Sequence, residues 1–167
     1  MMSKDKIKLY SDGACLGNPG PGGFGVVLIW GSRRKELNGG FRMTTNNRME
    51  ILAVIKGLQA ISSTKRFDVD VFTDSRLVVN AFNQGWLVKW QANGWKRNRK
   101  DIVLNADLWK RLLAETGKHN VTFNWIEGHA GHAENERCDQ LSKDAAMEPL
   151  LDIDEGYEKA GGEKLFI

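Results

Sequence analysis

The order of strand-like and helix-like segments is the feature of this sequence that most restricts its fold. Three segments rich in β-branched, aromatic and aliphatic residues come first, separated by short connections: residues 7–14, 24–30 and 33–43. Short connections favour antiparallel pairing. Helix-like and strand-like patterns then alternate, with helices expected at about 47–61, from 75, near 105–115 and at about 133–147, and strands at 68–74 and 121–126. This order predicts an α/β protein with a mixed sheet covered by helices on both faces.

The length of the chain suits a single domain, because domains commonly contain about 100–150 residues. The 167 residues are 41% hydrophobic and 27% charged, which is typical of a globular protein. We expect one domain over residues 1–150, with a basic, tryptophan-rich protrusion at about 86–104. Residues 151–167 are weakly patterned, and we predict that they form a weakly ordered tail.

The composition favours a cytoplasmic protein with no membrane partner. No apolar run approaches the roughly 20 residues that span a bilayer, and the first residues hold no apolar stretch long enough for a signal peptide. Two cysteines, Cys15 and Cys138, are too few for a disulfide scaffold. We therefore expect both thiols to be reduced.

Charge is distributed unevenly, although the net charge is only +3. Between Asp74 and Asp101 there is no acidic residue. The cations of this segment are Arg76, Lys89, Lys96, Arg97, Arg99 and Lys100, and its tryptophans are Trp86, Trp90 and Trp95. Cations neutralise phosphates and flat rings pack on sugars or bases, so the combination favours a nucleic-acid partner. A solvated basic helix with tryptophans in the core is the alternative.

The glycine-rich stretch at residues 20–25 matches the G-x-G-x-x-G pattern of nucleotide-binding loops. A dinucleotide site needs a helix after this loop, so that the helix N-terminus can hold the pyrophosphate. Here the loop runs into FGVVLIW, which is typical of a strand, and the lysine strand, catalytic loop and D-F-G of kinases are missing. We interpret the stretch as a long hairpin loop.

Four acidic residues lie at or beside the ends of predicted elements: Asp12, Glu50, Asp74 and Asp139. Singly, each has an ordinary structural interpretation. Asp12 can be a turn residue and Asp74 an N-cap. Glu50 can be a capping-box residue, three positions after Asn47. The last acid lies beside the apolar stripe of the final helix.

Together, the four acids favour a metal site. Neighbouring central strands can bring Asp12 and Asp74 side by side, and the covering helices can bring Glu50 and Asp139 over them. Clustered carboxylates repel one another unless a cation lies among them, and oxygen-only ligands suit Mg²⁺ or Mn²⁺. Two such ions about 3.5–4 Å apart are the usual arrangement for in-line phosphodiester cleavage. The basic, tryptophan-rich segment would then hold the polymer.

The stretch EGHAGHAENERCD, residues 127–139, admits three interpretations: half of a zinc site, a catalytic loop leading into a helix, or a polar turn. The ligands available for zinc are His129, His132, Cys15 and Cys138. No C-x2–4-C spacing exists, and Cys138 falls on the apolar stripe of the last helix, where a buried thiol is expected. We expect His129 in a loop, where it can exchange protons near neutral pH.

Five motifs in this order carry a resemblance to a known family: YSDGACLGNPGPGGFG, TTNNRME, FTDS, the W-x3-W-x4-W of residues 86–95, and GHAGHAENERCD. They resemble type 1 ribonuclease H of the bacterial kind, and the match spans nearly the whole chain. The resemblance implies a five-stranded mixed sheet flanked by helices. It also implies an endoribonuclease that cleaves the RNA strand of RNA–DNA hybrids with Mg²⁺ or Mn²⁺, using two ions, and leaves 5′-phosphate and 3′-hydroxyl ends.

The resemblance assigns roles residue by residue. The metal-binding carboxylates that it implies are Asp12, Glu50, Asp74 and Asp139. His129 matches a catalytic histidine that assists proton transfer or product release, and Glu136 matches an acid near one metal. The positions that match substrate-binding residues are Cys15, Asn18, Asn46 and Asn47 for the minor groove, Thr45 and Asn105 for a DNA-strand phosphate, Trp86 and Trp90 for DNA sugars, and Arg76. Amides in a shallow groove can sense the 2′-hydroxyl that marks RNA.

The sequence departs from bacterial relatives where the DNA strand would bind. Relatives often carry a tight cluster of cations between the second and third tryptophans, where this chain has QAN at residues 91–93. Met43 replaces an arginine near the phosphate pocket, although Arg42 is adjacent. Two alternatives remain. The carboxylate set disfavours a hybrid-binding module without activity, and the asparagine set disfavours a nuclease acting on DNA alone. We expect a monomer, and the sequence leaves open whether the tail binds a protein partner.

Overall fold

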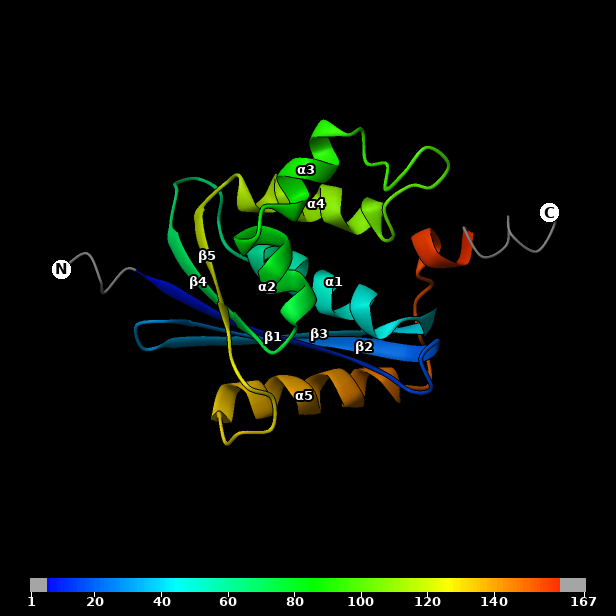
Figure 1. The fold of residues 1–167 in the computed structure, drawn as a ribbon. Helices are drawn as coiled ribbons and strands as arrows, with labels where there is room; N and C mark the ends of the chain where they lie inside the picture. Colours follow the sequence, from blue (N-terminus) through cyan, green and yellow to red (C-terminus); the bar gives the residue numbers. More distant parts are fainter. Residues whose placement is uncertain (1–5, 160–167) are drawn as a thin grey trace.

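The fold is built on one five-stranded sheet, shown in Figure 1 for the computed structural model, which describes residues 6–159. The strands are β1 (Ile7–Cys15), β2 (Gly20–Trp30), β3 (Arg33–Thr44), β4 (Asp68–Thr73) and β5 (Asn120–Trp125). Their order in the sheet is β3-β2-β1-β4-β5. The first three pair antiparallel, whereas β4 pairs in parallel with both β1 and β5. The mixed, five-stranded sheet that the sequence predicts is confirmed.

Helices cover both faces of this sheet, as predicted. They are α1 (Asn46–Gln59), α2 (Arg76–Asn83), α3 (Trp86–Ala92), α4 (Ala106–Thr116) and α5 (Ala133–Ala146). In Figure 1, α1 to α4 lie on one side of the sheet and α5 lies alone on the other. Among the described residues, no helix has both the length and the apolar character that crossing a membrane requires.

β2 begins earlier than the sequence pattern indicates. The glycine-rich residues 20–25, which we interpreted as a loop, belong to this strand and pair with β1. The glycines allow α5 to pack closely on the strand, because a Cβ at Gly23 would meet the carbonyl oxygen of Ser142 and a Cβ at Gly25 that of Cys138. The stretch is therefore neither a nucleotide-binding loop nor a hairpin loop.

α1 begins at Asn46, and Thr45 is its N-cap. The Thr45 hydroxyl accepts a hydrogen bond from the backbone N–H of Arg48 at 3.3 Å, which satisfies one of the free donors of the first turn. The capping-box interpretation of Glu50 is therefore wrong, because it required Asn47 as the cap. Glu50 therefore has no part in capping α1.

The apolar core lies between α1 and the sheet. Met49, Ile51 and Ile55 of α1 are fully buried, as are Leu9 of β1 and Val71 of β4. Burying an aliphatic side chain of this size stabilises the fold by about 1.5–3 kcal/mol. This packing holds the start of α1 against the two central strands, which is where the candidate site lies.

The segment after α5 is attached to the body of the protein, where the sequence pattern predicted a weakly ordered tail. Backbone hydrogen bonds join it to β3: Arg42 N–H donates to the Asp152 carbonyl at 2.9 Å, and Asp152 N–H donates to the Gly40 carbonyl at 3.1 Å. The hydropathy pattern did not reveal these contacts because polar groups make them. The rest of the predicted tail, residues 160–167, lies outside the described residues.

A buried ion-pair network ties this segment to α1 and α4. The Arg48 side chain is 4% exposed, and it bonds Asp154 through Nε at 2.7 Å and Asp107 through Nη2 at 2.7 Å. Asp154 also accepts a hydrogen bond from the Thr44 hydroxyl at 2.6 Å. Burial opposes the charged guanidinium, but its hydrogen bonds with Asp107 and Asp154 raise the pKa of Arg48 overall.

We expect Asp154→Ala to lower the free energy of unfolding by about 3–5 kcal/mol, because it leaves a buried guanidinium without its buried carboxylate partner. Urea denaturation measures this change. The matched control is Glu158→Ala in the same segment, which removes the ion pair with Arg42 (2.8 Å), whose own side chain is 57% exposed. An exposed pair contributes little, so the control should unfold like the wild type. Equal midpoints for the two variants would contradict the prediction.

Candidate active site

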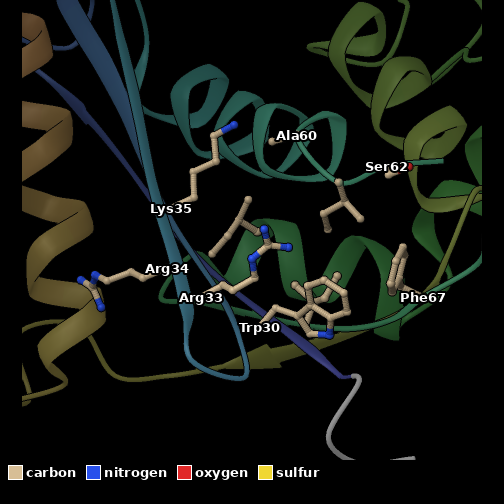
Figure 2. Close-up of a pocket in the computed structure, with 10 residues that line it drawn as sticks. Trp30, Arg33, Arg34, Lys35, Ala60, Ser62 and Phe67 are labelled. Carbon is tan, nitrogen blue, oxygen red and sulfur yellow. The ribbon is translucent and has the colours of Figure 1, made fainter. Parts of the chain in front are cut away.

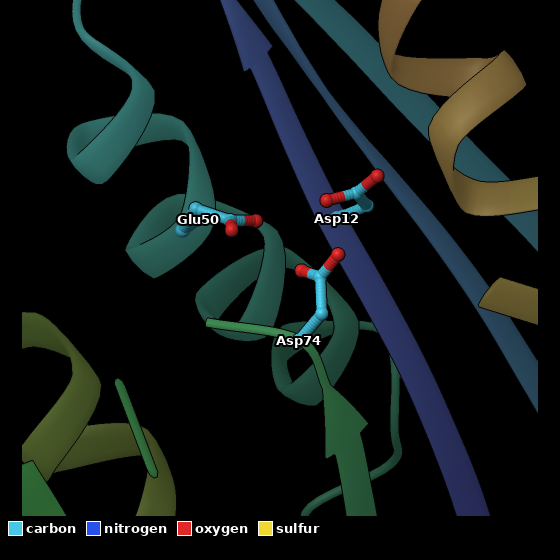
Figure 3. Close-up of side chains that lie close together, drawn as sticks. All are labelled: Asp12, Glu50 and Asp74. Atoms are coloured by element: carbon cyan, nitrogen blue, oxygen red, sulfur yellow. The ribbon is translucent and has the colours of Figure 1, made fainter. Parts of the chain in front are cut away.

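Three carboxylates from three elements meet near the carboxyl ends of β1 and β4 (Figure 3). Asp12 lies on β1, Asp74 directly follows β4, and Glu50 projects from the first half of α1. One oxygen atom of each carboxylate lies within 4.8 Å of an oxygen atom of the other two. The structure therefore brings together three of the four acids for which the sequence predicts a cluster.

The register of the sheet and one close contact produce this meeting. β1 and β4 pair in parallel up to Tyr10 and Phe72, so the residues two positions further along, Asp12 and Asp74, are neighbours. α1 can reach the same point because of Gly13, where a Cβ would lie 2.6 Å from the backbone nitrogen of Glu50. A side chain at this glycine would push the start of α1, and its carboxylate, away from the strands.

Burial and mutual repulsion both disfavour the charged forms of these carboxylates. Burial, and then the charges of Asp74 and Asp139, raises the pKa of Asp12 to about 8. Burial and the charges of Asp12 and Asp74 raise the pKa of Glu50 well above its usual value, and burial also raises the pKa of Asp74. Glu50 Oε1 is buried without a hydrogen-bond partner. An all-oxygen site with an unsatisfied buried acceptor fits a hard divalent cation such as Mg²⁺ or Mn²⁺.

Asp139, the fourth predicted acid, lies near the cluster but pairs with a lysine. Its Oδ2 is 2.9 Å from Nζ of Lys143, one turn later on α5. The charge of Asp139 contributes to the raised pKa values of Asp12 and Asp74, so it lies within electrostatic reach of them. A cation bound between Asp139 and the cluster would have to displace Lys143. Glu136 is exposed in the first turn of α5.

His129 lies in the exposed loop between β5 and α5 and has a φ of 58°. The preceding Gly128 packs on the cluster, since a Cβ at that position would meet Oδ2 of Asp74. A positive charge on His129 lowers the pKa of Asp74, against the larger raising effect of burial. The loop position beside the carboxylates is as predicted, and the catalytic role of His129 stays a prediction. No sequence motif predicted Gly128 as a contact of the cluster.

The residues that we expect at the minor groove gather around the loop after β1 and the start of α1. The Asn18 side-chain oxygen accepts a hydrogen bond from the Asn46 N–H at 3.0 Å. The Cys15 thiol donates to two backbone carbonyls at 3.4 Å, and burial raises its pKa. Asn46 and Asn47 are exposed. A rigid, polar edge therefore borders the carboxylate cluster.

Thr45 and Asn105, which we expect to bind a phosphate, are linked through Arg48. In addition to its bond with the Thr45 cap, Arg48 donates through Nη1 to the Asn105 side-chain oxygen at 3.3 Å. Asn105 begins α4 with a φ of 63°, a conformation that asparagine tolerates. Met43 is 40% exposed. The buried ion-pair network thus also supports the two predicted phosphate-binding residues.

The tryptophans of the basic protrusion are anchored in the core and partly exposed. Trp86 and Trp90 lie on α3 with ring centres 6.1 Å apart, and Trp90 packs on the buried Trp109 of α4 at 5.8 Å. The packing of these rings agrees with tryptophans in the core, and both rings remain partly exposed. Binding of nucleic acid by this segment stays a prediction. Arg97 pairs with Asp101 at 3.4 Å.

The zinc interpretation of residues 127–139 is wrong. Cys138 is fully buried against Val27 and Leu141, and burial raises the pKa of its thiol strongly. His129 and His132 are both exposed. Within residues 6–159, the group of possible metal ligands that lie close enough together is the carboxylate cluster.

A separate pocket of about 450 Å³ lies at the other end of the central strands (Figure 2). It is lined by the first residue of β1, by Trp30 at the end of β2 and by Phe67 before β4, with cations such as Arg33 at its edge. None of its lining residues belongs to the predicted site. The pocket and the carboxylate cluster are therefore distinct.

Comparison with known proteins agrees with the site. Residues 4–147 match the family model described as RNase H. A Ribonuclease H of Syntrophus aciditrophicus (strain SB) is 58% identical over 152 residues, which are 91% of this chain and 87% of that protein. A Ribonuclease H of Desulforamulus reducens is 58% identical over 149 residues, which are 89% of this chain and 92% of that protein. The crystal structure of LC9-RNase H1, described as a type 1 RNase H with the type 2 active-site motif, is 36% identical with a TM-score of 0.77, covering 85% of this chain and 72% of that one.

A cluster of carboxylates on a mixed sheet is the arrangement expected of a metal-dependent hydrolase. The family match and the identities with relatives over most of their length go further: the chain belongs to the ribonuclease H family, and is a metal-dependent endoribonuclease. The resemblance that the sequence motifs carry is confirmed.

The raised pKa of Asp12 makes the stability of the metal-free protein depend on pH. The pKa of Asp12 in the folded protein is about 8, above its ordinary value of 3.8, so the folded form holds a proton that the unfolded chain releases more easily. Stability is therefore greatest at low pH within this window and falls as the pH rises from about 4 to about 8. Asp12→Asn keeps position 12 neutral at every pH. At pH 8 in EDTA it should raise the free energy of unfolding by on the order of 2 kcal/mol, or the melting temperature by about 4–8 °C.

Thermal melts at pH 5 and pH 8 in EDTA test this prediction. The control is Glu148→Gln, which changes an exposed acid just beyond α5 and should melt like the wild type at both pH values. If Asp12→Asn loses as much stability between pH 5 and pH 8 as the wild type does, the pKa of Asp12 is not raised and the prediction fails.

Proposed function

We propose that this protein hydrolyses the RNA strand of RNA–DNA hybrids, by in-line attack at a site that binds two divalent ions, and leaves 5′-phosphate and 3′-hydroxyl ends. The observation that carries the proposal is the carboxylate cluster of Asp12, Glu50 and Asp74. Membership of the ribonuclease H family and the relatives named Ribonuclease H support the substrate class.

The carboxylates have the chemistry that such a reaction requires. Bound divalent ions would supply an activated water and charge stabilisation for the leaving 3′ oxygen. Asp12, Glu50 and Asp74 would hold them, with Asp139 contributing once Lys143 has moved away. His129, exposed on its loop beside Asp74, would carry a proton to or from the reacting groups or assist product release. Mg²⁺ is the expected ion, and Mn²⁺ should substitute for it.

Recognition of the hybrid follows from the polar edge beside the cluster. Cys15, Asn18, Asn46 and Asn47 would line the minor groove, where amide groups can bond the 2′-hydroxyls of the RNA strand. Thr45 and Asn105 would hold a phosphate of the DNA strand, and the half-buried rings of Trp86 and Trp90 would pack on its deoxyriboses. The cations of the protrusion would neutralise further phosphates.

A cleavage assay with matched duplexes tests the proposed function. We expect labelled RNA–DNA hybrid to be cut in its RNA strand with Mg²⁺ or Mn²⁺, while duplex DNA and duplex RNA remain intact. EDTA and Asp12→Asn should each abolish cleavage, because both remove the bound ions. Hybrid binding without cleavage by the wild type would indicate a binding module without activity. Cleavage of duplex DNA would indicate a DNA nuclease.

Single substitutions of His129 and Asp139 should have different effects on turnover and on metal binding. His129→Ala should slow turnover about 10²-fold or more, as expected for the loss of a proton-transfer group, while metal binding measured by calorimetry survives. Asp139→Ala should weaken both turnover and metal binding, because it removes a metal ligand. His132→Ala, an exposed histidine three residues away, is the control and should change neither. An unchanged rate in His129→Ala would rule out its catalytic role.

A monomeric state and a cytoplasmic location remain predictions. The segment up to Lys159 is attached to β3 through its backbone and through Asp154.

A further inference from the structure

Trp125, for which the sequence motifs indicated no role, contacts two residues of the candidate site. It is the last residue of β5 and is 39% exposed. Its indole N–H donates a hydrogen bond to the backbone carbonyl of Asp74 at 3.1 Å. The guanidinium carbon of Arg76 lies 3.9 Å from the centre of its ring. The loop that carries His129 begins directly after it. One side chain thus joins a cluster residue and a cation at the start of the histidine loop.

The bond to Asp74 extends the sheet beyond its last ladder position. β4 and β5 pair in parallel to their ends, where Thr73 lies opposite Trp125. Ile126 N–H then donates to the Thr73 carbonyl at 3.0 Å, and the indole of Trp125 holds the next carbonyl along β4, that of Asp74. Asp74 lies past the end of the strand, so this side chain takes the place of a ladder partner. The hydrogen bond therefore limits how far the Asp74 backbone can rotate.

Arg76 is held in a geometry that suits a phosphate. It is the exposed first residue of α2, and within residues 6–159 no carboxylate lies within 4.0 Å of its guanidinium. Stacking on Trp125 uses the flat face of the guanidinium and leaves its N–H edges for bidentate hydrogen bonds. Phosphate oxygens match this fork. Because the ring already orders the side chain, less rotamer freedom is lost on binding.

We infer that Trp125 is a positioning residue, which presents Arg76 to a backbone phosphate of the bound RNA strand and fixes the carbonyl of Asp74. Arg76 follows Asp74 by two residues, so the phosphate that it meets must lie beside the phosphate being cleaved. A nucleic-acid strand approaching three carboxylates is repelled, and a cation at this position offsets the repulsion. The inference rests on the proposed function, because it requires a nucleic-acid strand at the cluster.

The chain offers a matched control for this pair. Arg33 lies over the ring of Trp30 with its guanidinium carbon 5.9 Å from the ring centre. Figure 2 shows both residues at the separate pocket, which lies at the opposite end of the central strands from the carboxylates. Substitutions of Arg33 therefore change an arginine–tryptophan pair and the total charge without changing the site.

Steady-state kinetics on labelled RNA–DNA hybrid test the inference. Arg76→Lys keeps the charge but loses the planar fork, and we expect it to raise KM threefold to tenfold with kcat changed less than twofold. Trp125→Leu removes the ring and should raise KM by a similar factor. The double variant should show no larger rise in KM than either single variant, since ring and arginine act as one unit. Arg33→Lys should leave both parameters at their wild-type values.

Trp125→Phe separates the two contacts of the indole. It keeps a ring under Arg76 but removes the N–H that bonds Asp74, so KM should stay near the wild-type value while kcat falls severalfold. If Trp125 had only a structural role, loss of the contact with Arg76 would not change KM selectively, and loss of the hydrogen bond to Asp74 would not change kcat selectively. Trp125→Phe and the Arg76 variants also keep the inference testable if Trp125→Leu does not fold, which a thermal melt shows.

Salt dependence of binding gives a second readout, measured by fluorescence anisotropy in an Asp12→Asn background that cannot cleave. Arg76→Gln should lower the slope of log K against log salt by about 0.9, the contribution of one phosphate contact, and Arg33→Gln should not. If the wild type cleaves the hybrid but the Arg76 variants keep its KM and salt slope, the inference is overturned and the proposed function stands. A wild type that does not cleave the hybrid would overturn the proposed function itself.

Discussion

Repulsion among three clustered carboxylates is the constraint on which the rest of this structure depends. Asp12, Glu50 and Asp74 have oxygen atoms within 4.8 Å of one another, and burial removes the water that would screen their charges. Without a cation, burial and this repulsion raise the pKa values of Asp12 and Glu50, so their neutral forms are favoured. The site therefore suits a divalent cation, which would reduce the repulsion among all three groups at once.

Rigid elements are what keep the cluster together against this repulsion. The parallel register of β1 and β4 places two of the carboxylates on adjacent strands. The absence of a side chain at Gly13 lets α1 bring the third within reach. Arg48 then anchors the start of α1 through Asp154 and Asp107, and it also supports the predicted phosphate pocket. A single buried arginine thus connects the C-terminal segment, the helix that carries Glu50 and the surface that would hold the DNA strand.

Much of the site could be anticipated from particular residues. Asp12 and Asp74 lie at the ends of apolar segments whose pattern predicts strands. Glu50 lies on the small, apolar face of a predicted helix. Contacts between segments distant in the sequence were harder to foresee. The glycines of β2 read as a loop because the sequence does not show that α5 packs on them. The segment after residue 150 read as a loose tail because buried ion pairs, not apolar residues, attach it. Trp125 had no motif to indicate its contacts with Asp74 and Arg76.

The sequence by itself determined the strand and helix order, the mixed sheet, the family, and three members of the carboxylate cluster, because local periodicity and long motifs encode each of these. The tertiary structure determined which of the four acids lie close together. Asp12, Glu50 and Asp74 form the compact group, whereas Asp139 lies nearby and pairs with Lys143. It also decided that Cys138 is a core thiol and that Trp125 joins Asp74 to Arg76. These outcomes depend on distances of a few ångströms between chain segments, and only the packed chain sets such distances.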